Sequence, residues 1–177
     1  MAVLRARGAA VDTATLDAWL AARLPGWRGP SSARVINGGN SNPVVRVDAA
    51  DGRVYALRSR APGVDPRAHA IDREYRVLRA LAGTAVPVPR AHLYCDDPAV
   101  VGQPFYLMDF VAGRIIDDAR LPGVARAERA AVYEDYARTF ARLHALDWRA
   151  LGLADYGKGA GYVRRQLRVL TAAYRAW

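Results

Sequence analysis

A chain of 177 residues, 52% of them hydrophobic, is long enough for one domain, or for one small lobe and the start of another, around a real core. The net charge of +9 comes with a single cysteine, which excludes an intramolecular disulfide and a cysteine-rich metal site. No apolar run is long enough for a membrane span or a signal peptide, so we expect a soluble, cytoplasmic protein without a membrane partner.

The basic residues are almost all arginines, because Lys158 is the only lysine among 26. They are spread over predicted strands, helices and loops and alternate with Asp and Glu. Nucleic-acid binding needs a clustered basic surface, so we predict no nucleic-acid partner. A basic RNA- or DNA-associating domain stays open as an alternative; its binding would fall steeply with salt.

The first predicted element is an amphipathic helix over residues 13–24, with apolar residues at helical spacing and Pro25 as its stop. Three extended segments follow at 33–36, 44–48 and 53–60. The Asp51-Gly52 pair between the last two is typical of a hairpin turn. The three segments therefore predict an antiparallel meander.

A second helix is predicted over 69–82, where apolar residues line one face. Two more strands, 91–95 and 104–111, are separated by a predicted turn at 96–98. Two helices follow at 126–146 and 161–176, and we expect both to expose apolar faces.

Three features of this order point to chemistry. A glycine-containing turn, Gly38-Gly39-Asn40-Ser41-Asn42, offers backbone N–H donors to a phosphate, while Pro43 has none. Arg58 lies in the third strand, and Glu74 lies sixteen positions later in the following helix. The order of phosphate loop, strand cation and helix carboxylate is typical of kinase-like folds that hold a nucleoside triphosphate. Taken singly, each feature is equally compatible with an ordinary hairpin turn, a solvated arginine and a charged helix face.

The stretch from Val35 to Trp177 resembles the beginning of the aminoglycoside phosphotransferase family, especially its branch associated with acyl-CoA dehydrogenases. The strings that carry the resemblance are Asn37-Gly38-Gly39-Asn40-Ser41-Asn42-Pro43, Tyr55-Ala56-Leu57-Arg58, residues 68–78, Val86-Pro87-Val88-Pro89, residues 104–113, Leu143-His144-Ala145-Leu146-Asp147 and residues 151–157. It implies an α+β fold with a protein-kinase-like small lobe, a five-stranded antiparallel sheet with one helix, followed by the first helices of the large lobe. The implied ranges are 1–30 for an N-terminal helix and linker, 31–112 for the nucleotide-binding lobe and 113–177 for the start of the helical lobe.

The resemblance also implies how ATP would bind. The turn at Gly38, Gly39, Asn40, Ser41 and Asn42 would cap the β- and γ-phosphates. Ala56, on the same strand face as Arg58, would lie under the adenine, and Glu74 would hold Arg58 against the phosphates. The backbone C=O of Asp109 and N–H of Val111, in a hinge at 108–113, would recognise the adenine. Related small-molecule kinases use arginine as well as lysine at the position of Arg58, so the arginine does not imply a dead site.

The chain has no string of the His-Gly-Asp type, and its asparagines all lie at 37, 40 and 42. We therefore expect neither the catalytic aspartate nor the magnesium ligands here, and negligible phosphate transfer by this chain alone. Asp155-Tyr156-Gly157 is not taken as a magnesium site. His69 and His92 have no motif partners, His144 is interpreted as structural, and zinc is not expected.

The leading hypothesis is the N-terminal part of an ATP-dependent small-molecule phosphotransferase. Magnesium and a small-molecule acceptor belong to the full-length family member, and the missing C-terminal lobe or a dehydrogenase-type protein would be the partner. The alternative is a nucleotide-binding, pseudokinase-like fragment without catalysis.

Overall fold

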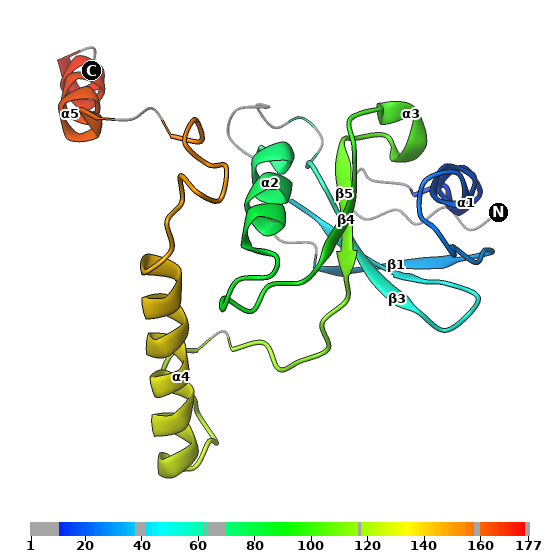
Figure 1. Ribbon diagram of the computed structural model, residues 1–177, viewed down its shortest axis with the longest axis horizontal. Coiled ribbons are helices and arrows are strands. Elements are labelled where there is room, and N and C mark those ends of the chain that lie inside the picture. Colours follow the sequence, from blue (N-terminus) through cyan, green and yellow to red (C-terminus); the bar gives the residue numbers. More distant parts are fainter. Residues whose placement is uncertain are drawn as a thin grey trace. The chain divides into compact units, whose positions relative to one another are not determined.

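The computed structural model describes residues 11–37, 42–61, 63, 70–116, 118–157 and 160–175 and has an α+β fold (Figure 1). Its elements in chain order are α1 (Thr13–Ala21), β1 (Ser32–Asn37), β2 (Val44–Asp48), β3 (Val54–Ser59), α2 (Ile71–Leu81), β4 (Ala91–Cys95), α3 (Pro98–Val101), β5 (Phe105–Asp109), α4 (Arg126–His144) and α5 (Tyr162–Arg175). The five strands form one antiparallel sheet in the order β1-β2-β3-β5-β4. The predicted fold class is confirmed.

The hairpin between β2 and β3 fixes the register of the sheet centre. Val44 pairs with Arg58 at one end and Asp48 pairs with Val54 at the other. Gly52 closes the turn with a φ of +84°, a left-handed conformation that glycine adopts without steric cost. The turn predicted from Asp51-Gly52 thus sets which side chains of β2 and β3 face the same way.

One face of the sheet, called here the back face, carries the apolar core. Side chains one residue apart along a strand point to opposite faces, so Val45, Leu57 and Leu107 share this side. Leu16 and Leu20 of α1 and Val101 of α3 belong to the same core. Figure 1 draws α1 and α3 together on one side of β4 and β5, with α2 on the other.

The opposite, front face of β3 presents Val54, Ala56 and Arg58, and α2 packs against β4 and β5. The apolar stripe of α2 is anchored by Ile71 and Leu81, which are both buried. An amphipathic helix packed on one end of a sheet leaves the other end of that face uncovered. This uncovered end is where the candidate site lies.

Two helical segments differ most from the sequence-based expectation. α1 ends at Ala21 rather than Leu24, because the chain turns there and the Leu20 carbonyl accepts from both Arg23 and Leu24 N–H. The expected turn at 96–98 opens a one-turn helix instead. Asp97 caps it by accepting from the Ala99 N–H, and Gly102 ends it at a φ of +87°. Four residues are too few to show helical periodicity in a sequence.

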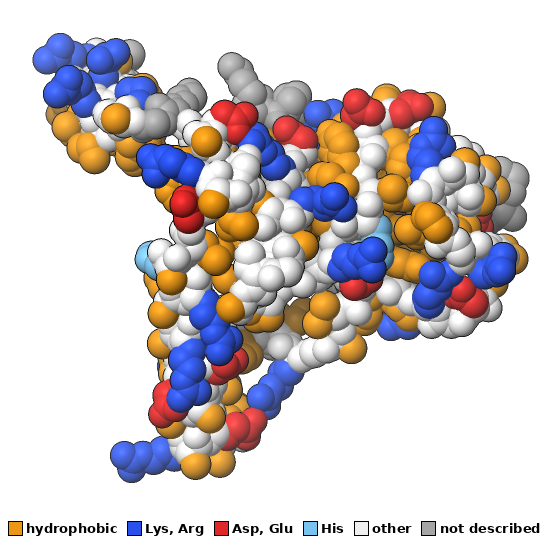
Figure 2. Space-filling model, viewed as in Figure 1, with side chains coloured by type: hydrophobic (Ala, Val, Ile, Leu, Met, Phe, Trp, Pro, Cys, Tyr) orange, Lys and Arg blue, Asp and Glu red, His pale blue; other side chains and the backbone are white. Residues whose placement is uncertain are grey.

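The chain divides into two compact units, Met1–Ala145 and Leu146–Trp177. The ranges 1–30, 31–112 and 113–177 derived from the resemblance stay predictions. Neither α4 nor α5 has a buried residue among those described, which confirms that both helices expose apolar side chains. Figure 2 shows hydrophobic side chains at the surface among charged ones on the face it presents. No described helix is long and apolar enough to cross a membrane.

Candidate functional site

Arg58 and Glu74 form the predicted ion pair on the front face. Nε of Arg58 lies 2.7 Å from Oε2 of Glu74, and Nη2 donates a 3.4 Å hydrogen bond to Oε1. The Nε–H is buried but does not point along the line to Oε2, so it makes an ionic contact without a hydrogen bond. Both side chains are about a third exposed, at 27% and 34%. The pair therefore lies at the edge of the core and not in bulk solvent.

Glu74 accepts from two further side chains that the sequence did not indicate. The Tyr106 hydroxyl of β5 donates to Oε2 over 3.1 Å, and the Asn42 amide donates to Oε1 over 3.2 Å. Burial raises the pKa of the Tyr106 hydroxyl far above its ordinary value, and the neighbouring Glu74 carboxylate adds to this effect. Tyr106 is therefore a hydrogen-bond donor at any physiological pH.

Aromatic packing holds the helix that carries Glu74. The Tyr75 ring stacks on Tyr94 of β4 with centroids 5.7 Å apart and lies 6.1 Å from the Tyr106 ring. These contacts restrict how α2 can rotate or slide along the sheet. The position of the Glu74 carboxylate is thus set by ring packing as well as by its hydrogen bonds.

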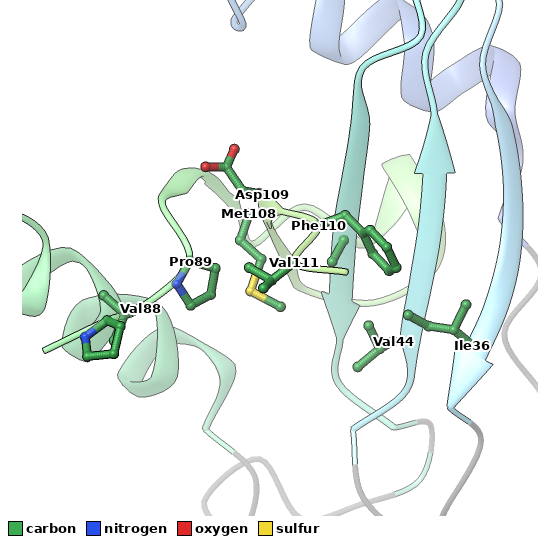
Figure 3. A pocket seen from close by; sticks show the side chains of 10 residues that line it. Ile36, Val44, Val88, Pro89, Met108, Asp109, Phe110 and Val111 are labelled. Carbon is green, nitrogen blue, oxygen red and sulfur yellow. The ribbon is translucent and has the colours of Figure 1, made fainter. Parts of the chain in front are cut away.

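An apolar cleft (Figure 3) lies on the face of β3 that presents Arg58, since Ala56, two positions before Arg58, lines it. It has a volume of about 420 Å³. Its lining residues, which define the cleft, are Ile36, Val44, Ala56, Pro87, Val88, Pro89, Met108, Asp109, Phe110 and Val111. Ala56 is the small residue beneath the opening, two positions before Arg58. A cleft of this size and polarity is typical of small-molecule sites, which hold a flat ring by apolar contact.

The segment after β5 offers backbone groups to the cleft. Asp109 N–H donates to the Arg90 carbonyl, and Phe110 N–H donates to the Val54 carbonyl. Val111 is 68% exposed, and within the described part of the chain its N–H makes no hydrogen bond. The Val111 N–H is therefore available to a ligand in the cleft. The predicted roles of Asp109 and Val111 in adenine recognition stay predictions.

The Asp109 side chain has a different partner from its backbone. Figure 3 shows its carboxylate turned away from the apolar side chains of the cleft. Its Oδ1 lies 2.6 Å from Nε2 of His92, whose ring also meets the Tyr55 ring edge-on. His92 has no motif partner in the sequence, and its contact with Asp109 joins two neighbouring strands, which a sequence motif cannot show. His144, interpreted as structural, contacts the Phe140 ring.

A cation lies at the outer rim of the cleft. The Arg46 guanidinium sits 4.9 Å from the centre of the Phe110 ring and forms an ion pair with Asp48. Hydrogen bonding from Arg46 is the main cause that lowers the pKa of the Asp48 carboxyl. Because Phe110 lines the cleft, this stacking limits the freedom of one wall of the cleft.

The structure brings the side chains of Asn42, Ala56, Arg58 and Glu74 to one face, and Asp109 and Val111 line the cleft on that face. Gly38, Gly39, Asn40 and Ser41 lie outside the described residues. Sequence reasoning missed Tyr106 and the lining role of Pro87-Val88-Pro89. Strand alternation alone could not have indicated Tyr106, because its pairing with Arg58 depends on the order of the strands in the sheet. In the sequence, the prolines of this segment indicated only a break in regular structure and gave no sign of a contact with a ligand.

Residues 32–177 match the model of the phosphotransferase enzyme family. The chain belongs to this family. Among curated relatives, this chain is 41% identical over 170 residues to acyl-CoA dehydrogenase family member 11 of Rattus norvegicus, covering 93% of this chain and 22% of that protein. It is 39% identical over 149 residues to acyl-CoA dehydrogenase family member 10 of Mus musculus, covering 84% of this chain and 14% of that protein. The chain thus spans about a fifth or less of these relatives.

Two solved structures extend the comparison. This chain is 42% identical to a Ralstonia eutropha protein provisionally named an aminoglycoside phosphotransferase, with a TM-score of 0.79 over 93% of this chain and 47% of that one. It also matches APH(2″)-IIa, solved in a ternary complex with streptomycin and ATP, at a TM-score of 0.53 and 15% identity over 77% of this chain and 41% of that one. The second match concerns the fold alone.

Proposed function

We propose that this chain is the nucleotide-binding part of an ATP-dependent small-molecule phosphotransferase. The observation that carries the proposal is the Arg58 guanidinium, held by Glu74 on the strand face that also lines the apolar cleft. A purine in the cleft would rest on Ala56, and a phosphate chain extending from it would reach the cation two residues along the same strand face. In this arrangement the Arg58 guanidinium would bind phosphate, the Glu74 carboxylate would hold Arg58 in place, and the cleft would bind the purine.

The residues present fit ATP. Within the described residues, Arg58 donates a hydrogen bond only through Nη2, and its buried Nε–H has no hydrogen-bond partner. Arginine has five N–H donors, so several remain for phosphate oxygens after Glu74 is bound. The cleft supplies apolar walls, and Val111 supplies a free backbone N–H at its rim. When bound, ATP would supply the phosphoryl group, and this chain would bind and orient it.

The rest of the reaction is proposed from the family. The acceptor would be a small hydroxylated molecule, and magnesium would assist transfer in the whole protein. The catalytic aspartate and the metal ligands have no counterpart string in this sequence, so this chain alone would bind ATP but transfer phosphate negligibly. The relatives named as acyl-CoA dehydrogenases suggest a dehydrogenase-type protein as partner. A cytoplasmic location follows as part of the same proposal.

Titration of the 177-residue chain with MgATP by isothermal calorimetry tests the proposal. Arg58→Ala should weaken binding about 10- to 100-fold, because hydrogen bonds to a charged group contribute about 1.5–3 kcal/mol. The matched control is Arg120→Ala, which removes one positive charge at an 88% exposed side chain and should leave the affinity unchanged.

Three other outcomes would overturn the proposal. Equal weakening by both substitutions would indicate binding through overall positive charge. Absence of MgATP binding, together with salt-sensitive binding of RNA or DNA that ignores Arg58, would favour the nucleic-acid alternative. ATP binding with no transfer by the full-length protein would favour the pseudokinase alternative.

A further inference from the structure

Asn42 is one of two buried polar residues among those described, and its side chain is 3% exposed. Both ends of its amide are engaged. Oδ1 accepts from the Ala61 N–H over 3.4 Å, and Nδ2 donates to Oε1 of Glu74 over 3.2 Å. The side chain therefore joins the end of the β3 segment to the helix carboxylate and does not face a ligand.

The Glu74 carboxylate needs this contact to keep its orientation. Oε2 receives the Tyr106 hydroxyl and lies nearest to Arg58, whereas Oε1 receives Nη2 of Arg58 and Nδ2 of Asn42. The Nη2 bond is long at 3.4 Å, so Asn42 makes the shorter of the two hydrogen bonds to Oε1. Without Asn42, the carboxylate could rotate about its own axis and carry the guanidinium with it.

We propose that Asn42 is a positioning residue that holds Glu74, and through it Arg58, in the orientation that presents Arg58 to a phosphate. This inference rests on the proposed function. An amide suits the role, because its two ends donate to a carboxylate and accept from a backbone N–H at once. An aspartate would place a second negative charge against Glu74, and a serine would be too short to reach it.

The placement of Asn42 in the chain adds a consequence. It is the last residue of the predicted glycine turn 38–42 and directly precedes Pro43, whose carbonyl accepts from the Ser59 N–H. The hydrogen bonds from Ala61 N–H to Asn42 and from Ser59 N–H to Pro43 fix the chain at the C-terminal end of the glycine turn. The same residue thus holds the ion pair and one end of the segment predicted to meet the phosphates.

The test measures MgATP affinity of the 177-residue chain in a double-substitution cycle. Asn42→Ala should weaken binding about 3- to 10-fold in the otherwise unchanged chain. In a Glu74→Ala background the same substitution should have almost no further effect, because the group through which Asn42 acts is gone. Loss of packing alone would give the same factor in both backgrounds.

Ser59→Ala is the matched control, since Ser59 is the other buried polar residue and points to the back face of β3. It should leave the affinity unchanged. Should Asn42→Ala fail to fold, Asn42→Ser retains a hydroxyl near Ala61 and should show the same dependence on Glu74.

The outcomes separate this inference from the proposed function. If Arg58→Ala weakens MgATP binding and Asn42→Ala does not, the positioning role is wrong and the nucleotide site stands. An equal effect of Asn42→Ala with and without Glu74 also overturns the role. If the unchanged chain binds no MgATP, the proposed function fails and takes this inference with it.

Discussion

Replacing Phe105 by alanine is expected to lower the free energy of unfolding by about 3–5 kcal/mol, the usual cost of a phenylalanine removed from a packed core. The Phe105 side chain is 0% exposed and belongs to the core on the back face. The Trp19 ring of α1 meets it edge-on at 5.4 Å. The substitution therefore leaves a cavity between the sheet and α1 that neither element can easily fill.

The measurement is urea unfolding followed by tryptophan fluorescence, which reports on Trp19 beside the cavity. Phe140→Ala is the matched control, because Phe140 on α4 is 49% exposed. It should cost less than about 1 kcal/mol. Equal losses from the two substitutions would contradict the assignment of the core to the back face of the sheet.

Replacing Ala56 by progressively larger side chains is expected to weaken nucleotide binding by progressively larger factors. Ala56 is 4% exposed and lines the cleft, so a phenyl ring at this position would occupy the space proposed for a purine. A purine that buries on the order of 100 Å² of apolar surface gains about 2.5 kcal/mol, so Ala56→Phe should weaken MgATP binding about 70-fold. Ala56→Val should have a smaller effect of the same sign.

Calorimetric titration of the three chains checks this order. Ala127→Phe, the same substitution at an exposed position of α4, should leave the affinity unchanged. Thermal unfolding of each variant separates a blocked cleft from a lost fold, and Ala56→Val is the variant to rely on if the phenyl ring disrupts the sheet. An Ala56→Phe chain that folds and binds MgATP as tightly as the original would rule out the cleft as the purine site.

The fold was predictable because local signals and the hydrophobic pattern agreed. Asp51-Gly52 between two alternating segments predicted the hairpin, and the strands β2 and β4 begin and end where the pattern placed them. The short helix α3 was not predictable, since a single turn has no repeat to detect. Its capping by Asp97 and Gly102 can be recognised only once the backbone is known.

The ion pair at the site was predictable, and its surroundings were not. Arg58 and Glu74 are the charged residues that a kinase-like order requires, so their type and spacing sufficed. The contacts of Tyr106, Asn42 and His92 depend on which strands lie side by side. β5 enters the sheet between β3 and β4, and that insertion brings Tyr106 next to Arg58. No local pattern in the sequence encodes this strand order.

The alternation of β3 has a consequence for how substitutions in related proteins should be read. Tyr55 and Leu57 belong to the core, while Ala56 and Arg58 face the cleft and the ion pair. Substitutions at the odd-numbered positions of β3 should then change the stability of the fold. Substitutions at the even-numbered positions should change which ligand binds. Ligand preference could therefore drift between homologues by changes at every second position, without any compensating change in the interior.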